Sequence, residues 1–494
     1  MKRVIITVSL LFMAISTAHA AEDVLAKAMK LYEKRHYEET IAMLRSGPDS
    51  ADQARQGMLN LTLGMAYFKN AQLHRELYQA AASVSPDYLK KLSATQGQAR
   101  SRFVDLYLGD LLLETGKPGV AVTYLEKFAR TEGIDPRYRS IATVCLGLCY
   151  HHTNQAQQAQ DVWGAIDTTD PEVKAELAAA YSKAGLSDKE PVALADAALA
   201  EMKRSGKPLT MRALKNVLAV YARAGLTDKG LELLRHADLK GYSYRESLSK
   251  TKIITFYDIA LLSDVAALYG KASIGYLEKA ALDPKARDAA TFYLSQAYAL
   301  FGSIEQSSKV AAAFLISSQM PQLYKERIRV WQAANRYQKS TAADVVGVWE
   351  ELARKQGEDP DLLAEVLFAC TRLKAECAQL TKKSAAIVEA GDGKKFGILN
   401  IAIGKYYLGK LDFARAAAYL EAGRDKSNKN KIESNDPALL VELAEAYYRT
   451  KKYSEALEIY FEMSKQFPVV RQIQEAMQGM YAMEHKSAGD VKIN

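Results

Sequence analysis

Two nearly identical phrases decide the fold of this chain: "YSKAGLSDK" at residues 181–189 and "YARAGLTDK" at residues 221–229. Before the second phrase, apolar residues between Leu214 and Tyr221 recur at the i, i+3, i+4, i+7 spacing of an amphipathic helix. The Ala-Gly pair in each phrase predicts the end of that helix, because glycine adopts the left-handed C-cap conformation at little cost. Each copy therefore predicts a helix followed by a tight turn, and the second copy continues into another helix.

The same unit recurs along the chain, most fully in "ALLVELAEAYYRTKKYSEALEIYFEMSKQFP" at residues 438–468. Weaker copies begin near Val24 and Leu61. The good copies share small residues and aromatic residues at matching offsets: Leu440, Leu443, Ala444, Tyr447, Tyr453, Ala456, Tyr460, Met463 and Pro468; Leu146, Gly147, Tyr150, Ala159, Trp163, Ile166 and Pro171; Ile403, Gly404, Tyr407, Ala416 and Leu420; Leu108, Gly109, Leu112, Ala121, Leu125 and Phe128; Leu294, Ser295, Tyr298, Gly302 and Ser307.

This pattern resembles the tetratricopeptide repeat, in which two helices pack through small residues, with aromatic residues beside the contact and a closing proline. A small residue on each helix lets the two backbones approach, and a large neighbour fills the remaining space. The resemblance implies an all-α fold: one continuous right-handed α-solenoid of about ten helical hairpins, with a C-terminal capping helix at 469–485.

Repeat quality divides the chain into blocks. We expect an N-terminal array at 21–237, a divergent helical segment at 238–390, and a C-terminal repeat pair with its capping helix at 391–484, followed by a flexible tail at 485–494. Within the divergent segment, 324–380 keeps the paired-helix periodicity but lacks the signature. "KIITFY" at 252–257 has strand-like composition, although we expect a helix there.

The first 20 residues have the three parts of a secretory signal peptide. Lys2 and Arg3 form a basic head, Val4 to Ile15 is an apolar run, and Ala18-His19-Ala20 offers a cleavage site. No cysteine follows that site, so a lipoprotein anchor is not indicated. No later stretch has the roughly 18 consecutive apolar residues of a membrane span. We therefore expect a soluble periplasmic protein.

Four cysteines in an exported chain raise the question of disulfides. Cys370 and Cys377 flank a polar stretch between two helical runs, and either a disulfide or two thiols fits this spacing. Cys145 and Cys149 are four apart, so they share one face of a single helix and are expected to stay reduced.

Sequence motifs that carry catalytic chemistry are missing. The chain contains no HExxH, no GxSxG, no GxxxxGK[ST] and no CxxCH. "CLGLCYHH" at 145–152 holds four candidate zinc ligands, but its two histidines point about 100° apart on a helix and do not align with both thiols. We expect no enzyme activity, no cofactor and no metal.

The net charge of +8 is mild for 494 residues and does not indicate a nucleic-acid partner. The resemblance implies binding of a protein partner through the concave face, which the first helices of the hairpins line. The exposed positions expected there are largely basic, and so predict an acidic protein segment or an anionic polysaccharide as ligand. They are Lys183, Arg212, Lys215, Arg223, Lys405, Tyr448 and Arg449, with His151 and His152 nearby.

The function that follows is that of a non-enzymatic periplasmic scaffold or adaptor. Envelope assembly, secretion, pilus biogenesis and polysaccharide export are the processes in which such a scaffold is expected. The alternative is a non-catalytic subunit that binds polysaccharide or peptidoglycan directly.

Overall fold

The computed structural model describes residues 21–46, 53–94, 103–186, 189–206, 209–236, 243–249, 252–257, 259–337, 347, 349–351, 359–391, 396–424, 437–465 and 473–474. The predicted signal peptide and tail, and nearly all of the predicted capping helix, lie outside these residues. Contacts group the chain into two compact units. Unit 1 comprises residues 1–73 and 269–463, and unit 2 comprises residues 74–268 and 464–494.

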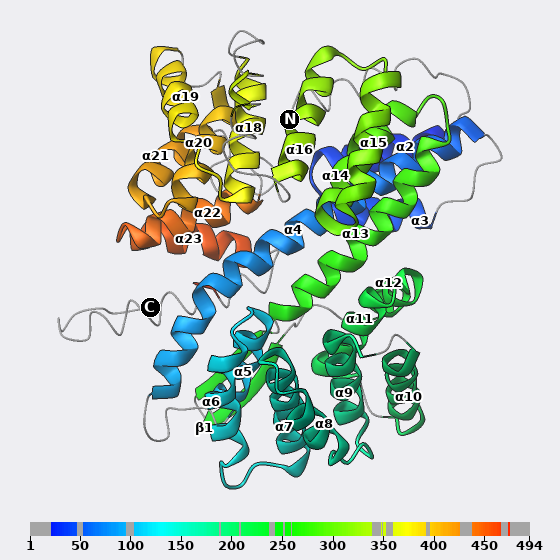
Figure 1. The fold of residues 1–494 in the computed structure, drawn as a ribbon, viewed down its shortest axis with the longest axis vertical. Coiled ribbons are helices and arrows are strands. Elements are labelled where there is room, and N and C mark those ends of the chain that lie inside the picture. The colour runs from blue at the N-terminus through cyan, green and yellow to red at the C-terminus, as the bar shows by residue number, and fades with distance from the viewer. Residues whose placement is uncertain are drawn as a thin grey trace. The chain divides into compact units, whose positions relative to one another are not determined.

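Unit 2 is built mainly of paired helices, labelled in Figure 1. Long helices α4 (Gln53–Ala94) and α13 (Ile259–Ala281) enter it with one half each. Its helix pairs are α5 (Val104–Glu114) with α6 (Pro118–Ala129), α7 (Pro136–His152) with α8 (Ala156–Gly164), α9 (Pro171–Ala184) with α10 (Lys189–Arg204), and α11 (Met211–Arg223) with α12 (Thr227–His236).

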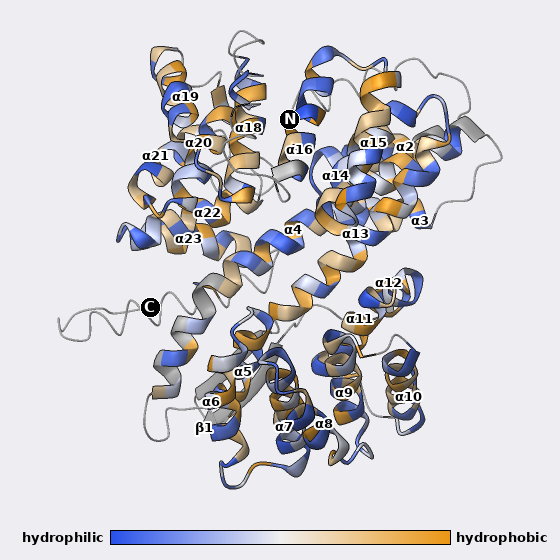
Figure 2. Ribbon diagram, viewed as in Figure 1, coloured by the Kyte–Doolittle hydropathy of each residue, from blue (hydrophilic) through white to orange (hydrophobic). Residues whose placement is uncertain are grey.

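Unit 1 repeats the same plan. It contains α2 (Ala21–Glu33) with α3 (Tyr37–Arg45), α14 (Arg287–Phe301) with α15 (Ile304–Ser317), α16 (Gln322–Tyr337), α18 (Pro360–Leu373) with α19 (Ala378–Ala390), α20 (Gly397–Gly409) with α21 (Phe413–Gly423), and α22 (Pro437–Arg449) with α23 (Tyr453–Ser464). Helices in both units carry hydrophobic residues on one side and hydrophilic residues on the other (Figure 2). The all-α tetratricopeptide-like prediction is confirmed.

The small residues of the signature are the points where paired helices touch. A Cβ atom added at Gly109 would lie 2.6 Å from the Leu125 side chain, and one at Gly404 would lie 2.6 Å from Leu420. A Cβ at Gly147 would likewise collide with the indole of Trp163. In all three hairpins the two residues are 16 apart, so one register of helix packing is repeated.

A second signature was not recognised in the sequence. When the large residue of a hairpin is Trp or Tyr, its polar hydrogen is donated to a carbonyl 19 residues earlier. Trp163 donates to Val144, Tyr460 to Val441, and Trp349 to Val330. Trp349 lies in the region expected to lack the signature, so that expectation was wrong: Ala333 there takes the place of Gly147.

The weak copy near Leu61 pairs with a distant partner. Gly64 packs on Leu277, where an added Cβ would lie 2.6 Å from the leucine Cγ, and Tyr67 stacks on Tyr276 with ring centroids 5.5 Å apart. The first half of α4 and the second half of α13 thus form one hairpin of unit 1. Residues 74–268 of unit 2 take the place of its turn. Sequence periodicity does not reveal this insertion, because each half-hairpin looks ordinary by itself.

The opening phrases are hairpin turns, as predicted. Gly185 and Gly225 have φ of 67° and 73°, the left-handed region that favours glycine. Tyr221 of the second phrase donates a hydrogen bond of 2.5 Å to Asp196 on α10, and Tyr181 packs edge-on against Trp163 on α8. The two tyrosines therefore join each first helix to the second helix of the preceding hairpin.

Residues 252–257 form a strand rather than the expected helix. β1 (Ser243–Ser249) pairs antiparallel with β2 (Lys252–Tyr257), with Ser243 opposite Tyr257 and an irregularity between Ser247 and Ser249. Two isoleucines, a threonine and two aromatic residues in succession favour extended backbone. The expectation of a helix was wrong, because it gave the helical repeats on either side more weight than this strand-like composition.

Candidate functional site

The first helices α5, α7, α9 and α11 of unit 2 pack one against the next, and the layer that they form is called its inner face. A buried carboxylate lies within this layer. Glu176 on α9 accepts hydrogen bonds from Arg212 Nε at 2.5 Å and from Asn216 Nδ2 at 2.8 Å, both on α11. It also accepts one from the Cys145 thiol on α7 at 3.5 Å. One side chain therefore connects three consecutive first helices.

A second carboxylate extends the network to α5. Asp110 Oδ2 lies 2.9 Å from Lys215 Nζ and 3.3 Å from Arg212 Nη2. One turn later on α5, Glu114 forms an ion pair with Lys183 of α9. Lys183 of α9 and Arg212 and Lys215 of α11 are thus neutralised by acidic side chains of α5 and α9.

This network changes the interpretation of the predicted concave site. Arg212 and Lys215 are 2% and 1% exposed, and the Lys183 side chain is 14% exposed. The expectation that these three side chains are exposed is therefore wrong. The sequence pattern of α9 and α11 indicates the direction of these three basic side chains. It does not show that Asp110 and Glu114 of α5 lie opposite them.

Ionisation follows from burial and charge together. Burial raises the pKa of Asp110, but the attraction of Lys215, Arg212 and Lys183 outweighs it and holds that pKa well below its usual range. Burial, together with the repulsion from Lys215, lowers the pKa of Lys183 to about 8 despite the attraction of Asp264 and Asp110. Asp110 and Lys183 are accordingly both charged at neutral pH, and Lys183 loses its charge as the pH rises past about 8.

Asp110, Cys145 and Glu176 also have candidate ligand atoms within 4.8 Å of one another. Metal binding would require the Cys145 thiolate, yet burial and the nearby Glu176 raise the pKa of this thiol well above its usual value. Arg212 and Lys215 already neutralise the carboxylates. The donor set therefore does not fit a metal ion. Burial likewise raises the pKa of Cys149 to about 12, and both cysteines are buried thiols.

Arg223, the fourth basic residue of the predicted set, is exposed at the last position of α11. His152 is exposed at the last position of α7, with its ring centroid 5.7 Å from that of His151. Burial, and then the positive charges of His151 and Arg223, lower the pKa of His152. Among the described residues, no hydrogen bond or ion pair joins Arg223 or His152 to a carboxylate.

The predicted site residues in unit 1 lie apart from this network in the sequence. Lys405 on α20 pairs with Glu442 on α22 at 3.0 Å. Tyr448 is 9% exposed, and its ring lies 5.3 Å from that of Tyr453. Arg449 is the more accessible member, with 40% of its side chain exposed and Glu445 Oε1 3.9 Å away.

Cys370 and Cys377 are joined in a disulfide across the turn between α18 and α19. Residues in and just before this turn also contact the neighbouring helices on both sides. Arg372 lies over the Trp331 ring of α16 at 3.9 Å, and Glu376 accepts a hydrogen bond of 2.9 Å from Tyr406 of α20. The disulfide therefore constrains a turn that touches the helices before and after it.

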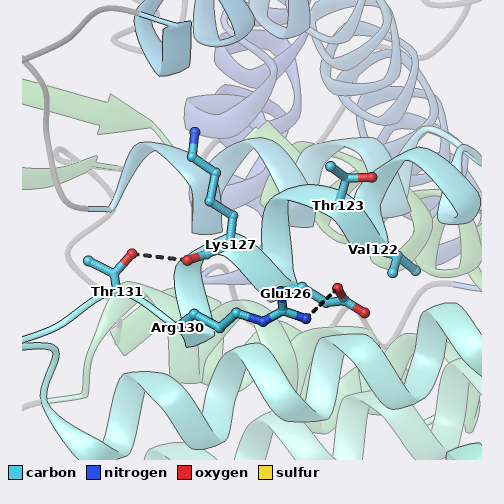
Figure 3. Close-up of a pocket in the computed structure, with 6 residues that line it drawn as sticks. All are labelled: Val122, Thr123, Glu126, Lys127, Arg130 and Thr131. Atoms are coloured by element: carbon cyan, nitrogen blue, oxygen red, sulfur yellow. Dashed lines mark hydrogen bonds and ion pairs between the residues drawn. The ribbon is translucent and has the colours of Figure 1, made fainter.

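A hollow of about 400 Å³ lies along α6, and its lining offers little for chemistry. Figure 3 shows Glu126 paired with Arg130, whose closest atoms are 3.1 Å apart, and Thr131 bonded to the Lys127 carbonyl. Its other lining residues are Val122 and Thr123. Every lining residue comes from α6 or the turn after it, and none pairs a nucleophile with a base. Separately, no helix within the described ranges is long and apolar enough to cross a membrane.

Comparison with known proteins gives similarity in structure only. No protein-family model matches the chain, and no curated protein sequence matches it. The tetratricopeptide domain of P58(IPK) is similar at 14% identity and a TM-score of 0.22, with 78% of this chain and 99% of that chain covered. The APC/C hetero-tetramer Cut9-Hcn1 is similar at 12% identity and a TM-score of 0.28, with 92% and 84% covered.

A signal-transduction ATPase with a tetratricopeptide repeat sensor, PH0952 from Pyrococcus horikoshii, is similar at 11% identity and a TM-score of 0.30. The alignment covers 86% of this chain and 77% of that chain. At TM-scores this low, the fold assignment rests on the repeated hairpin packing of the chain itself.

Proposed function

We propose that this chain is a non-catalytic scaffold that binds a protein partner through surfaces of its helical hairpins. The observation that carries the proposal is the repeated hairpin register, in which the same small-to-large contact recurs 16 residues apart. Arrays of this kind expose long faces that suit extended contacts with another protein. The chemistry of the buried network in unit 2 supports the proposal, because its charged groups neutralise one another.

The signal-peptide pattern at residues 1–20 supports a periplasmic location for this scaffold. Envelope assembly, secretion, pilus biogenesis and polysaccharide export are the processes in which a soluble adaptor of this kind has a role. An acidic partner segment fits the surplus of basic residues in the chain, which carries 66 Lys and Arg against 58 Asp and Glu.

Direct binding of polysaccharide or peptidoglycan is the second candidate. The contact of Arg372 Cζ with the Trp331 ring, 3.9 Å from its centroid, is the observation that favours it, because aromatic rings that offer a face to a ligand can stack on sugars. Both residues are only partly exposed, and Trp331 Nε1 lies 3.4 Å from Glu365, so this contact also has a structural explanation. We therefore rank protein binding first.

The test is affinity capture with the tagged chain lacking residues 1–20, followed by reconstitution with the purified partner. The proposal predicts one protein that is retained reproducibly and binds again when both components are pure. Retention of polysaccharide in place of protein would support the second candidate. If purified candidates never rebind, the scaffold proposal is wrong.

A further inference from the structure

The ends of the first helices in unit 2 line up along one edge of the inner face. His152, Lys183 and Arg223 each lie two positions before the left-handed residue of their hairpin turn, namely Asn154, Gly185 and Gly225. Helix α9 packs on both α7 and α11, so these three positions are neighbours on adjacent helices. On α5, Glu114 occupies the same position before Gly116.

Some basic side chains of these helices form ion pairs with carboxylates, and others do not. Lys183 is paired with Glu114, as Arg212 is with Glu176 and Lys215 with Asp110. These buried cations cannot also bind a partner without giving up their carboxylates, and a buried charge left without its partner is strongly destabilising. Binding of an anion by the inner face itself is therefore disfavoured.

His152 and Arg223 are different, because both are exposed and no carboxylate among the described residues is bonded to them. Arg223 lowers the pKa of His152 and also that of Lys183, so it lies close enough to repel both. The negative end of a helix dipole accounts for one basic residue at a helix C-terminus. It does not account for two adjacent histidines at the end of α7 that lie close enough to Arg223 of α11 for its charge to act on His152.

We propose that the edge formed by His151, His152 and Arg223 binds a carboxylate-rich segment of a partner protein. This inference rests on the proposed function and names the chemistry of the partner. Separated point charges at three helix positions suit carboxylate side chains spaced along a peptide. A sugar polymer would also need exposed rings to stack on, and Trp163, whose ring lies 6.3 Å from that of His151, is buried.

The probe is a fluorescein-labelled octaglutamate peptide, titrated with the chain lacking residues 1–20 at low salt and followed by fluorescence polarisation. Charge reversal by Arg223→Glu is expected to weaken binding about tenfold, equivalent to roughly 1.4 kcal/mol. The matched control is Arg204→Glu, expected to change affinity by less than twofold. Arg204 is also exposed, ends α10, and also lies two positions before a left-handed glycine, Gly206, but it ends a second helix.

Protonation offers an independent readout. Binding of an anion favours charged histidine, so affinity should rise as pH falls below the ordinary histidine pKa of about 6.5, with the contribution of His152 appearing at lower pH because its pKa is lowered. The groups facing His152 are His151 on its own helix and Arg223 on α11, with the Lys183–Glu114 pair beside them. Replacing both histidines by glutamine should remove the pH dependence while circular dichroism stays unchanged.

Three outcomes would overturn the inference: no octaglutamate binding, equal weakening by the two charge reversals, or binding of alginate in preference to octaglutamate. If a purified partner still binds the wild-type chain when octaglutamate does not, the edge assignment fails while the scaffold function stands. If neither partner nor peptide binds, both fail.

Discussion

The contact between Gly147 and Trp163 predicts a large effect of one methyl group. Adding a Cβ at Gly147 places it 2.7 Å from both Cδ1 and Cε2 of the indole, and closer still to Nε1. The ring is 3% exposed and its Nε1 donates a 3.0 Å hydrogen bond to the Val144 carbonyl. Trp163 therefore cannot yield to Gly147→Ala without breaking that bond or separating α7 from α8.

The magnitude follows from three opposing effects. Overpacking a core costs about 1–3 kcal/mol. A hydrogen bond lost or distorted inside the hairpin costs about 1 kcal/mol more. Replacing glycine by alanine within a helix returns about 1 kcal/mol. Gly147→Ala should thus lower the free energy of unfolding of unit 2 by about 2 kcal/mol. The control, Gly164→Ala at the end of α8, has no atom within 4 Å of its added Cβ and should be neutral or slightly stabilising.

Urea denaturation followed by circular dichroism, with hydrogen exchange of peptides from α7 and α8, measures this effect. The decisive comparison is a double-mutant cycle with Trp163→Ala, because a leucine there would meet the new methyl group as Leu125 meets a Cβ at Gly109, whereas alanine removes the contact. In that background Gly147→Ala should cost less than about 0.5 kcal/mol, the range of additive error. The same large cost in both backgrounds would refute the packing register on which the fold assignment depends.

Three further perturbations test other features. Arg212→Met should cost about 3–5 kcal/mol because it leaves Glu176 buried without its cation, and adding Glu176→Leu should recover most of that loss in urea denaturation. The pKa of Lys183 in the folded chain is about 8, below the ordinary lysine value, so the unfolded chain binds more protons than the folded chain above pH 8. The free energy of unfolding should therefore rise by about 2 kcal/mol from pH 7 to pH 9.5. Lys183→Met should flatten that rise. Replacing Cys370 and Cys377 together by alanine should cost about 2.5 kcal/mol for a loop closed at a separation of 7 residues, and a reductant should destabilise the wild type but not the variant.

The sequence was sufficient to predict the parts of the fold that depend on local spacing. Helices, turns and the Gly147–Trp163 contact follow from residues less than one repeat apart. The pairing of Gly64 with Leu277 does not, because residues 74–268 separate its two helices. The hairpin of Ala333 and Trp349 could have been predicted from the sequence. It has a valine three residues before the small residue and a tryptophan 16 residues after it, as the hairpin of Gly147 and Trp163 does.

The candidate site shows the same limit. Arg212 and Lys215 were placed correctly on a first helix, but their burial depends on Asp110, more than 100 residues earlier. Spacing along one helix shows which way a side chain points and not what lies opposite it. Arg223 differs from them, because it is exposed at the end of its helix and forms no ion pair with a carboxylate among the described residues.

The most direct test of the account is site-specific photo-crosslinking in cells that make the protein. Benzoylphenylalanine at Leu186, an exposed turn residue next to the edge, reports contact there without removing a charge. The same group at exposed Ser205, after α10, is the control. The account predicts a crosslink to one protein partner from Leu186, lost on adding Arg223→Glu, and none from Ser205. Crosslinks of equal yield from both positions, or a Leu186 crosslink that survives Arg223→Glu, would contradict it.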